Sequence, residues 1–181
     1  MKKIIKQIKN ELEYLFSFVV NSYPDSSIGF RLRKNFWKKN LKKCGIAPVF
    51  MSNSEIISPE LIEIGENFLL GSTGLLNAKN SKGIYIGNEV QIARGAYLEA
   101  SNNKIDDINN LIMNEDTSNF GNKNYSIVID DDVWIGSNSI IMAGTYLGKG
   151  CVVSAGSVIN GKFENYSIIG GNPGRVIKKR F

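Results

Sequence analysis

The sequence predicts a mainly β protein, in which short strands coil into a parallel solenoid behind an α-helical start. Two observations support this fold class. Aliphatic residues return at every sixth position over a long part of the chain, and Gly, Asn and Asp follow them where turns are needed. The first 45 residues lack this repeat and hold 11 of the 22 Lys and Arg but 3 of the 17 Asp and Glu. A chain of 181 residues is long enough to bury a core in one domain.

Residues 1–45 form the predicted N-terminal helical region. Residues 3–20 place Ile, Leu, Phe and Val at helical spacing with Lys and Glu between them, which indicates an amphipathic helix. The segment 22–27 is typical of a turn, and a second helix is predicted over residues 28–43, ended by Gly45. The two basic helices can pack on the body of the protein, or they can make peripheral contact with a membrane surface.

The six-residue repeat predicts the solenoid over residues 46–181 and is clearest from residue 129 onward. Every sixth residue from there is Ile, Leu or Val, at positions 129, 135, 141, 147, 153 and 159. The fifth place of each hexad is small or β-branched: Val133, Ser139, Thr145, Cys151 and Ser157. The same phase appears earlier at positions 86, 92 and 98. A period of six fits a solenoid in which each flat strand ends at a turn and every sixth side chain points inward.

The repeat loses its phase between Leu98 and Ile129, which are 31 residues apart, because 31 is not a multiple of six. An extended loop is therefore predicted at about residues 103–126. Long loops that leave a compact repeat commonly carry function.

Several classes of function are excluded or not indicated. The chain has no histidine, so it has no His-based zinc site and no Ser-His-Asp or Cys-His catalysis, and no metal is expected. Cys44 and Cys151 lie too far apart for a metal-ligand or redox motif. The positive charge comes without a nucleic-acid-binding motif. No run of about 18 apolar residues occurs, so a cytoplasmic protein is expected, at the inner face of the membrane if its helices contact lipid.

Three motifs carry a resemblance to a known family. They are DDVWIGSNSIIMAG at residues 131–144, VVSAGSV at 152–158 and YSIIGGNPGRVIKKR at 166–180. With them the chain resembles the hexapeptide-repeat acyltransferases of the maltose and galactoside acetyltransferase type. The resemblance implies a left-handed parallel β-helix with N-terminal α-helices, acetyl-CoA as co-substrate, and a homotrimer with active sites between subunits. A gamma-type carbonic anhydrase shares the solenoid but needs three His ligands, which this chain lacks.

At the start of the predicted loop, the family reads Ser-x-Asn-His or similar, and its His is the general base for the acceptor hydroxyl. The matching residues here are 100–103, so Asn103 occupies the His position. An amide has no usable basicity near neutral pH, and loss of a general base costs about 10²–10⁴ in rate. Three interpretations remain open: a His-to-Asn variant made to trap substrates, a natural relative that lost catalysis, or another base. Glu99, Asp106 and Asp107 are candidates for that base, although such acids are also typical of a solvated turn.

The resemblance also assigns the coenzyme side of the site. Ser137 matches the position whose backbone N–H stabilises the oxyanion, and Trp134 matches the Trp beside the thioester channel. Coenzyme-binding positions match Ser137, Ala155, Gly156, Arg175, Lys178 and Lys179, the last three near the phosphates. A further phosphate contact of the family is missing at residues 160–162, where Lys162 is a candidate replacement. Each assignment has a structural alternative. Trp134 could pack on a coil face, Ala155 and Gly156 could be required by a tight corner, and the basic residues could form a solvated tail.

The acceptor side is assigned more weakly, to Ser72, Asn77, Asn102 and Asp106. Polar lining residues suit a sugar, and they also suit an exposed turn.

The leading expectation is an acetyl-CoA-dependent O-acetyltransferase that modifies a sugar hydroxyl of a surface polysaccharide or its precursor. One alternative is an N-acetyltransferase of an amino-sugar nucleotide, although such enzymes commonly have a different N-terminal domain. The other is a non-catalytic trimeric module that binds CoA or a partner protein.

Overall fold

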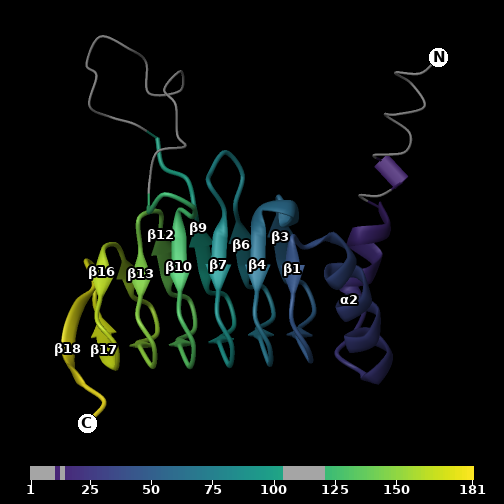
Figure 1. The fold of residues 1–181 in the computed structure, drawn as a ribbon. Coiled ribbons are helices and arrows are strands. Elements are labelled where there is room, and N and C mark those ends of the chain that lie inside the picture. The colour runs from purple at the N-terminus through teal and green to yellow at the C-terminus, as the bar shows by residue number, and fades with distance from the viewer. Residues whose placement is uncertain (1–10, 13–14, 104–120) are drawn as a thin grey trace.

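The computed structural model describes residues 11–12, 15–103 and 121–181, and its body is a three-sided parallel β-helix (Figure 1). Sheet A stacks β1 (Lys43–Cys44), β4 (Ile62–Ile64), β7 (Ile84–Ile86), β10 (Ile127–Ile129), β13 (Tyr146–Leu147) and β16 (Lys162–Phe163). Sheet B stacks β2 (Val49–Phe50), β5 (Leu69–Leu70), β8 (Gln91–Ile92), β11 (Trp134–Ile135), β14 (Val152–Val153) and β17 (Ser167–Gly170), with β18 (Arg175–Lys179) antiparallel at its edge. Sheet C stacks β3 (Glu55–Ile57), β6 (Leu75–Asn77), β9 (Tyr97–Glu99), β12 (Ile140–Met142) and β15 (Val158–Ile159).

The hexad positions form the core, as the repeat predicts. The aliphatic residues at 129, 135, 141, 147, 153 and 159 are all buried, and so are Val133, Ser139, Thr145, Cys151 and Ser157. Within sheet A, Ile64 pairs with Ile86, Ile86 with Ile129, and Ile129 with Leu147. Identical or similar side chains therefore stack directly on one another inside the solenoid, and this parallel β-helix confirms the predicted fold class.

The loss of phase has a clear structural meaning. Ile129 pairs directly with Ile86, so the chain between them adds only one coil in spite of its length. The chain leaves sheet C after β9 and rejoins sheet A at β10, where the Ser126 N–H donates to the Gly83 carbonyl over 2.9 Å. The excess chain therefore leaves and returns at the corner between sheets C and A.

The N-terminal end of the solenoid is covered by α2 (Ser27–Asn40), next to which residues 15–22 are also helical (Figure 1). The Ser26 side chain caps α2 by accepting from the Gly29 N–H. Trp37 is buried against Phe50 of the first coil, with ring centroids 6.4 Å apart. The helix ends three residues before the predicted position, because Leu41 is extended and Lys43–Cys44 already form β1. A short 3₁₀ turn, η1 (Pro59–Leu61), links β3 to β4.

Candidate active site

The corner between sheets B and C brings three of the predicted coenzyme residues, Ser137, Ala155 and Gly156, side by side, and we call this corner the coenzyme column. The Gly95 N–H donates to the Ser72 carbonyl (3.1 Å), the Asn138 N–H to the Arg94 carbonyl (3.0 Å), and the Gly156 N–H to the Ser137 carbonyl (2.9 Å). Successive coils are thus held together at this corner. Ser137 lies directly beside residues 155–156, as the proposed coenzyme path requires.

Small residues shape this corner. A Cβ on Gly136 would lie 2.6 Å from the Ala155 backbone nitrogen, so only glycine allows the two coils to stack there. Gly156 has a left-handed φ of 69°, which glycine adopts without strain, and a Cβ built on it would meet no atom within 4 Å. The surface outside Ala155 and Gly156 is therefore open, and a flat ligand arm can lie along it.

The Ser137 N–H is available at the same corner. Among the described residues, no backbone carbonyl accepts a hydrogen bond from it, whereas its neighbours Gly136 and Asn138 both donate to the adjacent coil. Trp134 stands three residues earlier on the outer face of sheet B, between Gln91 and Val152, and its side chain is 54% exposed. About half of its surface is therefore not buried against the coil and can contact a ligand or another chain.

The basic C-terminal strand continues the column. The Val158 N–H donates to the Gly171 carbonyl (3.0 Å) and the Gly174 N–H to the Val158 carbonyl (2.8 Å), which sets Arg175 beside this end of the corner. Arg175 and Lys178 are exposed. The Lys179 ammonium instead donates to Glu164 Oε2, the Asn165 carbonyl and Ser167 Oγ, at 3.0–3.2 Å. An ammonium has three donors, so Lys179 is engaged inside the chain and Arg175 and Lys178 are the better candidates for phosphate contacts.

Glu99 lies at the foot of the loop, at the other edge of sheet C, and organises a polar cluster. Its Oε2 accepts from Tyr97 Oη and from Asn77 Nδ2 (3.0 Å), and its Oε1 accepts from Ser101 Oγ (3.0 Å) and the Ser101 N–H (3.4 Å). Glu99 is half-buried, so the interpretation of this carboxylate as a solvated turn residue is wrong. Burial raises the pKa of the Tyr97 hydroxyl, and the hydrogen bond to Glu99 raises it further.

The predicted acceptor residues divide between the two corners. Asn77 joins the Glu99 cluster, and Asn102 and Asn103 follow it, the first half-buried and the second exposed. Ser72 lies instead at the other end of β6, in the coenzyme column. Asp106 and Asp107 lie outside the described residues. One chain therefore places the loop foot and the coenzyme column on opposite edges of sheet C.

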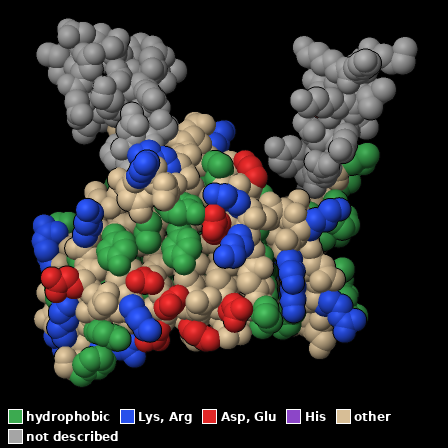
Figure 2. Space-filling view, viewed as in Figure 1, with side chains coloured by type: hydrophobic (Ala, Val, Ile, Leu, Met, Phe, Trp, Pro, Cys, Tyr) green, Lys and Arg blue, Asp and Glu red, His purple; other side chains and the backbone are tan. Residues whose placement is uncertain are grey.

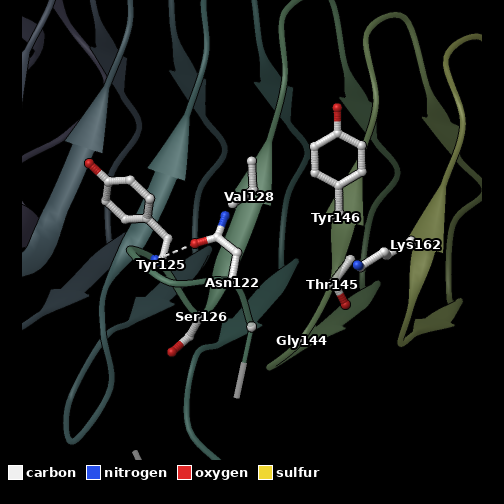
Figure 3. Close-up of a pocket in the computed structure, with 9 residues that line it drawn as sticks. Asn122, Tyr125, Ser126, Val128, Gly144, Thr145, Tyr146 and Lys162 are labelled. Atoms are coloured by element: carbon white, nitrogen blue, oxygen red, sulfur yellow. Dashed lines mark hydrogen bonds between the residues drawn. The ribbon is translucent and has the colours of Figure 1, made fainter. Parts of the chain in front are cut away.

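A cavity of about 320 Å³ opens on sheet A at the corner where the loop returns (Figure 3). Tyr125 and Tyr146 stand on either side of Val128, and Lys162 extends from β16 toward Thr145. Lys162 therefore lies on a different face from Arg175, which does not favour it as a replacement phosphate contact.

Sequence reasoning missed the cluster that anchors the returning chain beside this cavity. Tyr125 Oη donates to Glu63 Oε1 (2.6 Å), and Lys42 Nζ lies 2.9 Å from the same oxygen and over the Tyr125 ring. These contacts lower the pKa of Glu63, the hydrogen bond from Tyr125 first and that from Lys42 second. No short-range signal could reveal the cluster, because 62 residues separate Tyr125 from Glu63.

Both cysteines of the chain are free thiols. Burial raises the pKa of both Cys44 and Cys151, which keeps the thiols protonated and weakly nucleophilic near neutral pH. Within the part of the chain that the structure describes, no three His, Cys, Asp or Glu side chains form a group that could hold a metal ion.

Several known proteins are similar to this chain in sequence or in fold. The bacterial transferase hexapeptide family (six repeats) matches residues 126–161. Chloramphenicol acetyltransferase of Klebsiella aerogenes is 48% identical over 54 residues, which are 30% of this chain and 26% of that protein. WbbJ of Escherichia coli K12, named as a lipopolysaccharide biosynthesis O-acetyl transferase, is 41% identical over 54 residues, 30% of this chain and 28% of its own length. The match thus spans about a quarter of the length of these curated relatives.

Solved structures share the fold over nearly the whole chain. Maltose O-acetyltransferase from Clostridium difficile 630 has a TM-score of 0.74 at 24% identity, over 93% of this chain and 84% of that chain. The acetyltransferase VCA0836 of Vibrio cholerae O1 biovar eltor, solved with acetyl coenzyme A, has a TM-score of 0.68 at 23% identity, over 93% and 88%. At these identities the likeness is one of fold.

A three-sided solenoid of hexads, with small and basic residues aligned along one corner, defines the class of hexapeptide β-helix proteins. Residues 126–161 match the hexapeptide repeat of bacterial transferases, and the chain shares its fold with solved hexapeptide-repeat acetyltransferases.

Proposed function

We propose that the protein is an acetyl-CoA-dependent O-acetyltransferase whose acceptor is a sugar hydroxyl of a surface polysaccharide or its precursor. The observation that carries this proposal is the corner between sheets B and C, where Ser137, residues 155–156 and Arg175 follow one another along a single open column. A thioester carbonyl, a pantetheine arm and charged phosphates succeed one another in the same way along acetyl-CoA. The VCA0836 structure, which has this fold, was solved with that coenzyme.

In the proposed reaction the acceptor oxygen attacks the thioester carbon. The new C–O bond forms, the C–S bond breaks, and the hydroxyl proton must leave while the coenzyme departs as a thiol. The Ser137 N–H is placed to donate to the oxyanion that develops on the carbonyl oxygen, and one such donor contributes about 10²–10³ in rate. The protein's remaining task is to accept the proton.

Glu99 is the candidate base whose hydrogen bonds the structure describes. A carboxylate offers about four acceptor sites, and Glu99 already receives four donors from Tyr97, Asn77 and Ser101. Glu99 would have to lose one of these partners before it could take a proton from an acceptor. It is better suited to hold the loop foot and Asn77 in position, so among the described residues no carboxylate beside Asn103 is free to replace the family's His. We therefore propose that the chain binds both substrates and turns over slowly.

The two halves of the site come from different copies of the chain in this proposal. Met142 pairs with Glu99 at the end of β12, whereas Ser137 lies in the turn before β12, so the loop foot and the Ser137 N–H are at opposite edges of sheet C. Proton transfer and acyl transfer need heavy atoms within about 3 Å of the same hydroxyl. A loop foot from one subunit that faces the coenzyme column of the next would meet this requirement, in line with the trimer that the family resemblance implies.

The sugar acceptor rests on two supports. Two similar proteins are named as O-acetyltransferases that act in carbohydrate chemistry: WbbJ in lipopolysaccharide biosynthesis and the other enzyme on maltose. The loop foot offers an amide and hydroxyls, which pair with sugar hydroxyls as donors and acceptors. We propose the cytoplasm as the location, because the proposed reaction would draw its acetyl-CoA from there.

The deciding experiment compares thiol release from acetyl-CoA by the parent chain and by Asn103→His, with a panel of sugars, oligosaccharides and amino-sugar nucleotides. We expect Asn103→His to be faster than the parent by about 10²–10⁴ with one hydroxyl acceptor. The matched control is Asn102→His, which adds the same side chain one residue away and should give no gain.

Binding of CoA is measured alongside by calorimetry. If neither form transfers acetyl but both bind CoA, the non-catalytic module replaces the proposal. If transfer goes only to an amine, the N-acetyltransferase alternative is correct. If the parent alone is active, the argument from the missing histidine fails.

A further inference from the structure

The N-terminal end of the molecule exposes more apolar surface than the solenoid needs. Residues 12–28 include six large apolar side chains that are 54–68% exposed: Leu12, Leu15, Phe16, Phe18, Val19 and Ile28. Leu32 on α2 is 39% exposed. Single exposed apolar residues are common on soluble proteins, but a continuous group of this size marks an interaction surface.

Three of these side chains, Leu12, Phe16 and Leu32, line a groove between the two helical segments. Leu12, Phe16 and Val20 line one side, and Leu32 and Phe36 line the other, with a volume of about 540 Å³ between them. The ring centroids of Phe16 and Phe36, which line opposite sides of the groove, lie 5.9 Å apart. The opposite face of α2 is already used, because Gly29, Arg33 and Trp37 are buried on the first coil. The groove therefore faces away from the solenoid.

Basic side chains border this apolar surface. Arg31, Lys38 and Lys39 of α2 are exposed, and α2 contains no acidic residue. Among the described residues, none of these three cations makes an ion pair. Figure 2 shows Lys and Arg beside hydrophobic side chains at this end of the molecule, whereas acidic side chains gather over the solenoid.

We infer that this helical end face, formed by residues 11–12, 15–22 and α2, docks on a membrane surface that contains anionic lipid. Apolar side chains flanked by cations and almost free of acids match a lipid surface, into which apolar groups insert while Lys and Arg meet the phosphates. No helix among the described residues is long and apolar enough to span a bilayer, so the contact would lie in the interface. The lipid would meet the end of the solenoid opposite β18 (Figure 1).

The test uses the full chain and sedimentation with vesicles of phosphatidylcholine alone or with about 30% phosphatidylglycerol. We expect at least tenfold tighter binding to the anionic vesicles, and we expect it to weaken as salt rises from about 50 to about 500 mM, because screening shortens the reach of the charges.

Two sets of variants separate the two contributions. Arg31→Gln, Lys38→Gln and Lys39→Gln should each lower binding to anionic vesicles about fivefold. The matched control, Lys79→Gln with Lys123→Gln and Lys149→Gln, removes three exposed solenoid charges and should change binding by less than about twofold. Phe18→Ser with Ile28→Ser should lower binding at every salt concentration, with an unchanged melting temperature because both side chains are exposed.

Three outcomes would overturn the inference. The first is equal binding, or none, to the two kinds of vesicle. The second is an equal loss of binding from the helical and solenoid charge variants, which would indicate nonspecific attraction. The third is a change of oligomeric mass for Phe18→Ser with Ile28→Ser in the absence of vesicle binding, which would make this face an interface between copies of the chain. None of these results depends on acetyl transfer, so the inference stands or falls apart from the proposed enzymatic function.

Discussion

At the scale of single residues, Glu63 ties the returning loop to the first coils. Its carboxylate accepts from Tyr125 and lies against Lys42, and these partners hold the pKa of Glu63 below its usual value. A carboxylate with a lowered pKa in the folded state stabilises the protein above its ordinary pKa. That contribution is lost as the pH falls through the lowered value, because the folded state must then take up a proton that the unfolded state already holds.

We therefore expect Glu63→Gln to weaken the acid sensitivity of folding. At about pH 7 the variant should be less stable by about 0.5–1.5 kcal/mol, and it should lose less stability than the parent between about pH 5 and about pH 3. Urea unfolding at several pH values measures this. The control Glu60→Gln removes an exposed carboxylate of the same coil and should follow the parent. An unchanged pH profile in Glu63→Gln would show that the cluster contributes nothing.

At the scale of elements, α2 closes the open end of the solenoid through one buried cation. Arg33 is fully buried; its Nε donates to the Phe50 carbonyl (2.7 Å), and its Nη2 donates to Asp25 (2.6 Å). Asp25 also accepts from the Ser52 N–H of the first coil (2.8 Å). Burial lowers the pKa of Arg33, and Asp25 opposes this shift. Arg33 therefore donates a hydrogen bond to a backbone carbonyl of the first coil, which has no preceding coil to pair with.

Asp25→Asn tests this cap. The substitution keeps the size of the side chain but leaves the buried guanidinium without its counter-charge, so we expect the free energy of unfolding to fall by about 1–3 kcal/mol. Denaturant unfolding gives the value. The same measurement on Glu60→Gln, an exposed site, should differ from the parent by no more than about 0.5 kcal/mol. A variant as stable as the parent would mean that water replaces the ion pair without cost.

At the scale of the whole molecule, the loop foot and the coenzyme column lie on opposite edges of sheet C, so the proposed site would be completed by a second copy of the chain. We expect a solution mass of three chains by light scattering, unchanged over about a hundredfold range of concentration because obligate interfaces do not dissociate at micromolar levels. The exposed Trp134 supplies an internal probe, since its fluorescence should shift to the blue if a neighbour covers it. A monomeric mass would refute a shared site.

The repeat made much of the fold predictable. In a solenoid, every sixth side chain faces inward whatever the rest of the chain does, so local periodicity alone placed the core positions from Ile86 to Ile159. The alignment of residue 137 with residues 155–156 follows from the same repeat, because they are one coil apart, whereas their coenzyme role stays a prediction from the resemblance. The helices were predictable from their spacing, but the end of α2 was not, since Leu41 must leave the helix to start the first coil.

By itself, the sequence determined the class of fold, the buried hexads and the absence of a histidine base. The tertiary structure decided which polar residues meet. It showed that Lys179 is engaged while Arg175 and Lys178 are exposed, and that Ser72 and Asn77 lie at opposite ends of β6. It also showed that Glu99 accepts hydrogen bonds from Tyr97, Asn77 and Ser101. The physical reason is the separation of the residues along the sequence. Hexad positions follow from neighbours in sequence, whereas the polar contacts join residues that meet only when the coils stack and the loop returns.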